Sequence, residues 1–519
     1  MRIIDFTKLK YDAGSAVEKN PLTINADLCI FGGSSAGIAA AIQARRMGMD
    51  VVIVESSRHL GGLTTGGLGA TDIGNKAAIG GIAREFYGEV GKHYGSTEPD
   101  GTKWTFEPGV AKQIYLNWLQ SAEVPVYFNQ RLEKVDRQNG KISRLIMTNG
   151  NRFSAAVFID ATYEGDLLAS AAVAYHVGRE ANSVYRETLN GVHYGHPNHN
   201  FKVWVDPYTI PGKPDSGLIP GVTDAPVLRQ GQGDASVQAY NFRMCLTNVP
   251  DNRIPFPQPN GYDPDTYTLL SRYIQAGVWD ALCLHRMMPN GKTDLNNFGA
   301  ISTDHIGGGD KWPEGDSHTR ERLFQDHLRY NLGMLYFLSH DERVPESIRR
   351  EVGQWGLPAD EYPDSGHFTP QLYVREARRM ISEVVMTERH CRGYDVVDDP
   401  VGLAAYSMDS HNCRRLVIDG RCINEGNVEV APGAPYPISY RAIVPKGEQC
   451  VNLLVPVCLS SSHIAFGSIR MEPVFMILGQ SAATAAALAL EASCAVQEVD
   501  YSKLRNKLLA DKQVLEWKK

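Results

Sequence analysis

No two of the nine cysteines in this 519-residue sequence form a C-x-x-C pair. This absence argues against a zinc ribbon, an iron–sulfur segment and a redox dithiol, and the odd number argues against a disulfide framework. The sequence also lacks H-E-x-x-H and P-loop motifs, and potential metal ligands do not cluster along it. We therefore expect reduced, mostly buried cysteines and no metal site.

Neither sign of charge is in large excess. The chain has 52 Lys and Arg against 59 Asp and Glu, a formal net charge of −7, and the charged residues are mixed rather than grouped in blocks. A balance of this kind does not favour a nucleic-acid partner or an anionic membrane surface. We expect neither partner, and the oligomeric state stays open.

Long apolar runs are also scarce. Residues 1–25 carry no continuous apolar stretch of the kind found in a signal peptide, so we expect a cytoplasmic protein. The only apolar run of membrane length covers residues 473–490, but it is rich in alanine and contains Gln480, Ser481 and Thr484. We expect this run to form an internal helix.

What is present is a dinucleotide-binding pattern at residues 27–65. A short apolar strand at 28–31 leads through a glycine-rich turn into an alanine-rich helix, and a second strand follows at 51–54. The turn lets backbone N–H groups approach a pyrophosphate at the helix N-terminus. The residues expected to bind it are Gly32, Gly33, Ser34, Ser35, Ala36 and Gly37.

Two details refine this pattern. Ser34 stands where the middle glycine of G-x-G-x-x-G is usually found, but the order of strand, turn, helix and strand is intact. Glu55 ends the second strand, 18 residues after Gly37, where an acid accepts hydrogen bonds from a ribose. An acid there favours FAD or NAD over NADP.

The segment after Glu55 separates FAD from NAD. Residues 60–67, Leu-Gly-Gly-Leu-Thr-Thr-Gly-Gly, resemble the glycine-rich continuation in FAD-dependent oxidoreductases related to the glutathione reductase and fumarate reductase flavoproteins. This resemblance implies FAD as the cofactor. The residues that it implies as FAD contacts are Ser56, Gly61, Gly62, Leu63 and Thr64.

A second motif follows a run of short strands. Residues 124–160 alternate apolar strands with the hairpin signals Gln-Asn-Gly at 138–140 and Asn-Gly-Asn at 149–151, which predict an inserted β-meander. Its last strand runs into Phe-Ile-Asp-Ala-Thr-Tyr-Glu-Gly-Asp-Leu, residues 158–167, which resembles the second FAD motif of this class. The resemblance implies that Ala161, Thr162 and Asp166 lie near the pyrophosphate and ribityl chain.

A third motif lies near the C-terminus, at residues 458–473. Pro473 suits the first turn of a helix, whose N-terminus carries roughly half a positive charge. The resemblance implies that this helix start faces the pyrimidine end of the flavin. The cofactor residues implied here are Gly467, Arg470, Met471 and Glu472.

Residues 170–439 are irregular and rich in Pro, Gly, Asn and aromatics, with one clear helix expected at 320–339. Strings such as 292–299, 373–380 and 409–411 are similar to a large bacterial group of FAD-dependent oxidoreductases, often encoded near carbohydrate-degrading enzymes. The expected fold is α/β: a Rossmann-like FAD-binding domain with a parallel sheet and inserted β-meander, and a discontinuous α+β substrate or cap domain. The domains expected are 22–169 with 440–495 for FAD, 170–439 for substrate, and a C-terminal helical tail, 496–519.

Hydride transfer from a C–OH to the flavin requires a base for the hydroxyl proton and a group that holds the substrate. His463, beside the third motif, is the first candidate base, and His411 is the second. The alternative roles are packing or cofactor binding for His463, and a place in a polar turn, satisfied by its neighbours, for His411. Arg375 is the candidate substrate ligand, on an expected helix whose solvated face would also explain it. Asp294 and Asn296, in a turn-like string, are candidates for binding substrate hydroxyls.

The preferred function is oxidation of a C–OH in a small polar, carbohydrate-like molecule. Two alternatives stay open: reduction of an activated double bond or monooxygenation with the same cofactor, and a non-redox flavin-binding protein. A second G-x-G-x-x-G is absent from the sequence, so direct reduction by NADPH is not expected. The electron acceptor is unknown.

Overall fold

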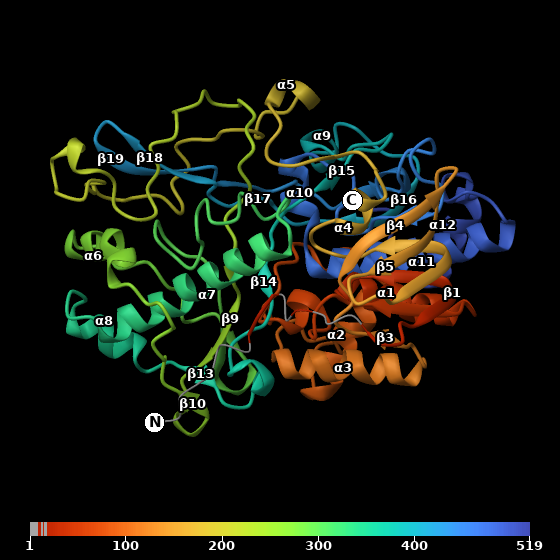
Figure 1. The fold of residues 1–519 in the computed structure, drawn as a ribbon, viewed down its shortest axis with the longest axis horizontal. Helices are drawn as coiled ribbons and strands as arrows, with labels where there is room; N and C mark the ends of the chain where they lie inside the picture. The colour runs from red at the N-terminus through yellow and green to blue at the C-terminus, as the bar shows by residue number, and fades with distance from the viewer. Residues whose placement is uncertain (1–8, 12–13, 15–17, 519) are drawn as a thin grey trace.

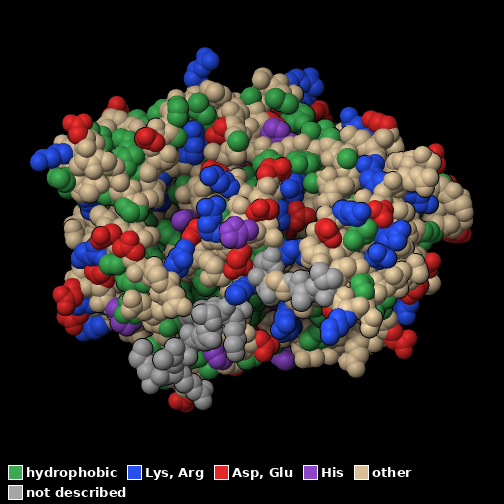
Figure 2. Space-filling model, viewed as in Figure 1, with side chains coloured by type: hydrophobic (Ala, Val, Ile, Leu, Met, Phe, Trp, Pro, Cys, Tyr) green, Lys and Arg blue, Asp and Glu red, His purple; other side chains and the backbone are tan. Residues whose placement is uncertain are grey.

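The computed structural model describes residues 9–11, 14 and 18–518, so the expectation about a signal peptide at 1–25 lies partly outside the described residues. The elements divide into two groups that lie side by side (Figure 1). On one side, segments from both ends of the chain lie together, and on the other side lie segments from its middle. Figure 2 shows basic and acidic side chains interspersed over the viewed face, as the mixed charges of the sequence predict.

The largest sheet of the described residues has seven strands, in the order β3-β2-β1-β6-β5-β4 with β22 paired to β6. Residues 28–31 of β1 are buried because parallel strands on either side and helices on the faces enclose them. The strands are β1 (Thr23–Phe31), β2 (Val51–Val54), β3 (Val126–Tyr127), β4 (Leu132–Gln138), β5 (Lys141–Met147), β6 (Arg152–Asp160) and β22 (Leu453–Leu454).

The β-meander prediction is confirmed by this sheet. Strands β4, β5 and β6 pair antiparallel in sequence order, and the β4–β5 turn places Asn139 and Gly140 at positive φ. Strand β22 then pairs parallel to β6, with Leu453 opposite Phe158. The C-terminal part of the chain therefore completes a sheet that the N-terminal part begins.

Two helices pack closely on this sheet, α1 (Ser35–Arg46) and α11 (Glu472–Ala492). A Cβ at Gly479 would lie 2.2 Å from the carbonyl oxygen of Ala36, so only glycine permits this approach. Helix α11 is long and apolar enough to span a membrane, but 83% of its apolar window is buried inside the protein. The predicted internal helix is therefore confirmed.

Helices α2 (Gly81–His93), α3 (Pro108–Ser121) and α12 (Tyr501–Ala510) also lie on this side of the molecule (Figure 1). Helices α2 and α3 pack against each other, and α2 also contacts α11. Helix α12 lies in the expected C-terminal tail and packs on α11. All nine cysteines lie in the described residues as free thiols, and seven of them are buried.

The middle of the chain forms small sheets around one long helix, α7 (Ser317–His340), which confirms the helix predicted at 320–339. Figure 1 shows α7 crossing this half of the molecule. Its other elements include α6 (Thr268–Gln275), α8 (Glu346–Val352), β9 (Met244–Thr247), β11 (Met287–Met288), β12 (Lys292–Leu295), β18 (Arg414–Ile418) and β19 (Arg421–Glu425).

The prediction of a helix around Arg375 was wrong. Strand β14 (Leu372–Tyr373) pairs with β8 (Asn241–Phe242), and β15 (Arg379–Met380) pairs with β7 (Tyr175–His176). The chain between them is not helical, so Arg375 and Arg379 do not share a helix face. The i, i+4 spacing of the arginines suggested a helix, but this segment has no apolar stripe that a helix could bury. Pairing with strands more than 100 residues away therefore decides its conformation.

Candidate active site

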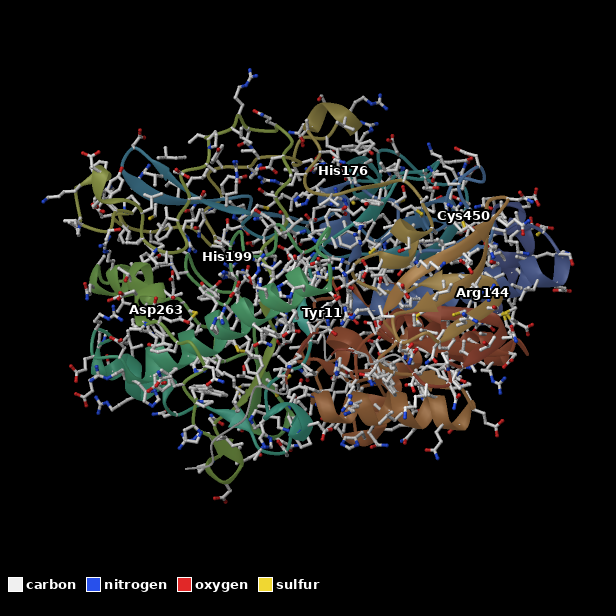
Figure 3. The ribbon with its side chains drawn as sticks, in the orientation of Figure 1. Tyr11, Arg144, His176, His199, Asp263 and Cys450 are labelled. Atoms are coloured by element: carbon white, nitrogen blue, oxygen red, sulfur yellow. The ribbon has the colours of Figure 1, made fainter. Side chains whose placement is uncertain are left out.

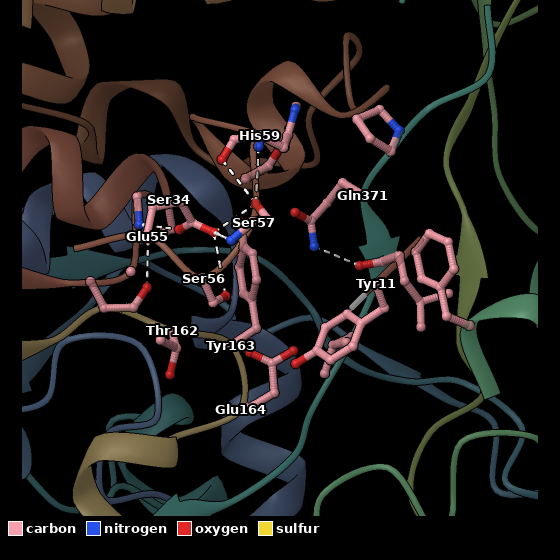
Figure 4. A pocket seen from close by; sticks show the side chains of 18 of the residues that line it. Tyr11, Ser34, Glu55, Ser56, Ser57, His59, Thr162, Tyr163, Glu164 and Gln371 are labelled. Atoms are coloured by element: carbon pink, nitrogen blue, oxygen red, sulfur yellow. Dashed lines mark hydrogen bonds between the residues drawn. The ribbon is translucent and has the colours of Figure 1, made fainter. Parts of the chain in front are cut away.

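A cavity opens where β1, β2 and β6 end at their carboxyl edges, the usual binding position in an open parallel sheet (Figure 4). One wall is made by the glycine turn, Glu55 and Thr162. The opposite wall comes from the middle of the chain and includes Trp312, Phe324 and Gln371. The cavity therefore lies between the two groups of elements.

The turn at the start of α1 permits only glycine at two positions. Gly32 has φ +106°, and a Cβ there would lie 2.7 Å from the carbonyl carbon of Ala161. A Cβ at Gly37 would lie 2.1 Å from the Gly32 carbonyl oxygen. Ser34, in place of the middle glycine, donates from Oγ to the Ala161 carbonyl at 2.7 Å and caps α1 by accepting from Gly37 N. This hydroxyl connects the turn to the second motif.

Glu55 lies at the end of β2 and lines the cavity. Its Oε2 accepts from Gly33 N at 2.7 Å, and its Oε1 accepts from the backbone N and hydroxyl of Ser57 at 2.7 and 2.6 Å. Ser56 Oγ also donates to Oε1, at 3.4 Å. These bonds fix the orientation of the carboxylate, and Oε2, which accepts one hydrogen bond within the described residues, keeps capacity for a ribose hydroxyl. The geometry fits the predicted role.

The glycine-rich continuation forms a short 3₁₀ turn, η2 (Gly62–Thr65). Leu63 N donates to the Tyr163 hydroxyl at 2.9 Å, so this turn contacts the second motif. His59 lines the cavity and lies 2.8 Å from the Gly62 carbonyl oxygen through Nε2. Burial lowers the pKa of His59 to about 4, so its ring is neutral at physiological pH.

Glu472, the first residue of α11, connects the three motifs. Its carboxylate accepts from Ser35 Oγ at 2.5 Å, from Thr64 Oγ1 at 2.8 Å and from the Tyr163 hydroxyl at 2.8 Å. Glu472 is 1% exposed, and burial raises its pKa while the three hydroxyl donors oppose that shift. The predicted cofactor residues at 35, 64 and 472 therefore meet at one buried carboxylate.

Hydrogen bonds to Asp160 fix the backbone of the second motif. Asp160 accepts from Thr162 Oγ1 at 2.7 Å and from Leu168 N at 2.9 Å, and burial raises its pKa to about 6. Asp166 starts α4 (Asp166–Ser170) and forms ion pairs with Arg320 at 2.6 Å and Arg378 at 2.7 Å. Asp166 therefore links the second motif to the middle of the chain.

The other predicted cofactor residues are distributed around the cavity and behind it. Ser56, Gly62 and Ala161 line it. Gly467 lies in α10 (His463–Ile469), where a Cβ would lie 2.4 Å from the Asp409 carbonyl oxygen, and Met471 is the N-cap of α11. Arg470 lies between α10 and α11, and its guanidinium contacts Tyr373 and Asp409.

Arg470 belongs to a closed set of side chains that we call the buried ring. Arg470 Nη1 donates to the Tyr373 hydroxyl at 2.7 Å, and Arg470 Nη2 lies 3.3 Å from Asp409 Oδ2. Tyr373 is flanked by Leu372 and Val374, which both line the cavity. The buried ring consists of Tyr373, Arg375, Asp304, His411, Asp409 and Arg470.

His411 and Arg375 complete the buried ring through Asp304. Asp304 Oδ1 lies 2.8 Å from Arg375 Nη1, and Asp304 Oδ2 lies 2.7 Å from His411 Nδ1. His411 Nε2 lies 3.5 Å from Asp409, and the Arg375 guanidinium lies 4.5 Å from the Tyr373 ring centre. Burial alone would raise the pKa of Asp409, but His411 and Arg470 lower it to about 2. The predicted catalytic residues His411 and Arg375 and the predicted cofactor residue Arg470 thus lie in one ring.

His463, the first candidate base, lies next to this ring in a more closed setting. Its Nδ1 lies 2.8 Å from Glu376 Oε2, its Nε2 lies 3.0 Å from Ser410 Oγ, and the residue is 1% exposed. Gln238 joins the two histidines: its Nε2 donates to Glu376 at 3.0 Å, and its Oε1 accepts from His411 N at 3.2 Å. The two candidate bases therefore belong to one network.

Several residues of this network were missed in the sequence. Glu376 adjoins Arg375 in a string that marks the family, so its position was a usable signal. Asp304 and Gln238 carried no pattern. The predicted hydroxyl ligands Asp294 and Asn296 bind protein groups: Asp294 pairs with Arg243 at 2.7 Å, and Asn296 accepts from Arg375 at 3.1 Å.

Solved flavoproteins resemble part of the chain. A flavin-containing monooxygenase from Stenotrophomonas maltophilia is 17% identical, with 31% of this chain and 43% of that chain covered and a TM-score of 0.21. A 3-ketosteroid dehydrogenase from Rhodococcus jostii is 14% identical, with 31% of this chain and 50% of that chain covered and a TM-score of 0.20. An L-amino acid deaminase from Proteus myxofaciens is also 14% identical, with 31% of this chain and 50% of that chain covered and a TM-score of 0.21. The chain spans half or less of the length of the first solved structures that it matches.

No curated protein matches the sequence. A family model described as FAD dependent oxidoreductase matches residues 27–508. The glycine turn, Glu55 and Tyr163 line one cavity at the N-terminus of α1, and the Glu472 carboxylate accepts from Tyr163 and from Ser35, the first residue of α1. This arrangement fits the same cofactor. The chain therefore belongs to the family of FAD-dependent oxidoreductases.

Proposed function

We propose that this FAD-dependent enzyme oxidises a C–OH group of a small, polar, uncharged molecule of carbohydrate type. The observation that carries the proposal is the buried ring, in which a histidine–carboxylate pair lies beside Arg470 of the third motif. FAD, when bound, supplies the acceptor for a hydride. The protein must then supply a base for the hydroxyl proton and donors that hold the substrate.

His411 is the better placed of the two bases. Asp304 accepts the Nδ1 proton of His411, which leaves Nε2 as the basic nitrogen, and the carboxylate stabilises the imidazolium that forms. Nε2 lies 3.5 Å from Oδ2 of Asp409, a carboxylate that offers it no proton. In contrast, both ring nitrogens of His463 lie within 3.0 Å of protein partners, which suits a positioning role.

The charges around the ring favour an uncharged substrate. Three buried arginines each pair with an aspartate: Arg243 with Asp294, Arg375 with Asp304 and Arg470 with Asp409. A substrate carboxylate would therefore meet arginines that are already neutralised.

The same arginines retain donors. Arg243 Nη1, Arg375 Nε and Arg470 Nε are buried and make no hydrogen bond within the described residues. Hydroxyl and carbonyl oxygens of a neutral polyol can accept from such groups, and buried donors without acceptors cost free energy. A polyhydroxylated substrate would satisfy them.

The test is anaerobic mixing of the FAD-loaded protein with aldoses, alditols, the matching aldonic acids and amino sugars, while flavin absorbance is followed. We expect bleaching by neutral members and little by the charged ones. Bleaching only by the acids would overturn the uncharged substrate. If no alcohol bleaches the flavin and chemically reduced protein is reoxidised by an activated alkene, the enzyme is a reductase. NADPH-dependent oxygen uptake with hydroxylated product would indicate a monooxygenase.

A further inference from the structure

The described residues before the dinucleotide-binding pattern include a short segment, residues 9–11, that lies between the two groups of elements. Figure 3 labels Tyr11 there. Leu9 is 4% exposed, and its carbonyl oxygen accepts from Gln325 Nε2 on α7 at 2.8 Å. One end of the segment is thus attached to the middle of the chain.

Tyr11 attaches the other end. Its ring lies 4.8 Å from the Trp312 ring in an edge-on contact, and the Arg131 guanidinium lies 4.8 Å from the same ring. Arg131 also donates to the Tyr11 carbonyl oxygen at 3.0 Å. Because Leu9 and Tyr11 are both held, the backbone of Lys10 between them has a defined position.

Lys10 and Tyr11 line the same cavity as Gly32, Gly33 and Ser34 (Figure 4). Among the described residues that line it, Lys10 is the only cationic side chain at neutral pH, because the pKa of His59 is lowered to about 4. Glu55 and Glu164 also line the cavity, and burial raises the pKa of Glu164 to about 7.

The pyrophosphate of FAD brings two negative charges to this cavity. The N-terminus of α1 offers about half a positive charge and has no basic side chain in its first turn. Most of the phosphate charge therefore requires another partner. A lysine ammonium is a compact cation with three donors that suits a phosphate oxygen.

We propose that Lys10 binds the pyrophosphate of FAD, and that Tyr11 holds Lys10 over the cavity. The cofactor site then includes a segment that precedes its βαβ unit, on the wall opposite the glycine turn. This inference concerns cofactor binding alone, so it does not depend on the substrate or on the direction of the redox reaction.

The test compares FAD release from purified holoenzyme for the parent, Lys10→Gln, Lys10→Arg and Lys19→Gln. Lys19 is exposed, and it provides the matched control. At low salt we expect Lys10→Gln to raise the FAD dissociation constant roughly 5- to 20-fold, Lys10→Arg to restore most of the affinity, and Lys19→Gln to change nothing. At 1 M salt, where the Debye length is about 3 Å, the difference between Lys10→Gln and the parent should shrink to about 2-fold.

A competition experiment identifies the part of FAD that Lys10 contacts. ADP should compete less well for Lys10→Gln than for the parent, whereas adenosine should compete equally well for both. Equal losses for ADP and adenosine, or equal FAD affinities of Lys10→Gln and Lys19→Gln at low salt, would overturn the proposal. Tyr11→Ala should reproduce the Lys10→Gln defect, and an unchanged affinity in that variant would remove Tyr11 from it.

Discussion

Oδ2 of Asp304 lies 2.7 Å from Nδ1 of His411, although 107 residues separate the two in the sequence. The pair is buried, and its carboxylate also holds Arg375. A fixed histidine tautomer, a carboxylate behind it and an arginine beside it are what a base for a substrate hydroxyl requires. This arrangement is open to direct tests.

The first prediction concerns the base. His411→Ala should bind FAD normally but slow flavin reduction by substrate roughly 10²–10⁴-fold, the usual loss for a general base. Asp304→Asn should be slowed as well, because an amide does not stabilise the imidazolium. Stopped-flow absorbance measures both. His463→Ala is the comparison: if it is the slow variant and His411→Ala is as fast as the parent, His463 is the base.

The second prediction concerns Glu472. Glu472→Ala leaves the hydroxyls of Ser35, Thr64 and Tyr163 without their buried acceptor. The lost interactions are worth roughly 1–3 kcal/mol, so FAD affinity should fall roughly 5- to 150-fold. Glu472→Gln keeps one acceptor oxygen and should lose less. Flavin fluorescence during dilution measures retention. Equal affinity of Glu472→Ala and the parent would refute the role of this carboxylate in assembling the site.

The third prediction concerns Glu55, which holds Gly33 N and lines the cavity. Glu55→Gln should weaken FAD binding by about 1.5–3 kcal/mol, the value of a charge-assisted hydrogen bond, and Glu55→Arg should be worse. Titration of the apoprotein with FAD, with circular dichroism as the control for folding, measures the change. Unchanged affinity in both variants would reduce Glu55 to a strand-end acid.

The fourth prediction uses pH. His327 on α7 is fully buried, and burial lowers its pKa to about 4, below the reference value of about 6.5. As the pH falls, His327 binds a proton in the unfolded chain at a higher pH than in the folded protein. The folded protein therefore loses stability as the pH falls from 6.5 towards 4. Between pH 7 and pH 5 the free energy of unfolding should fall by about 2 kcal/mol less in His327→Leu than in the parent. Melting curves at the two pH values test it, with His340→Leu, an exposed position on the same helix, as the control.

The cofactor half of this molecule could be predicted because its signals are local. Gly32, Ser34 and Glu55 lie within one βαβ unit, where backbone space and strand order dictate the residue types. The second motif follows its strand directly. In each case the physical requirement acts on neighbours in the sequence.

The substrate half could not be predicted in this way. His411 and Arg375 were singled out, but Asp304, which joins them, has no local pattern and reaches them only through tertiary packing. The prediction of a helix around Arg375 failed for the same reason, because the strands that pair on either side of Arg375, β8 and β7, come from far upstream. Lys10 precedes the βαβ unit and belongs to none of the three motifs, so no sequence pattern links it to the cofactor.

The hydrogen bond between Ser35 and Glu472 joins residues 437 positions apart. A ribosome that adds about 5–20 residues per second needs roughly 20–90 s to travel from one to the other. During that interval the nascent chain contains its glycine turn but lacks the carboxylate that binds Ser35, Thr64 and Tyr163. Stable cofactor loading therefore follows the end of translation, and prematurely terminated chains should emerge colourless.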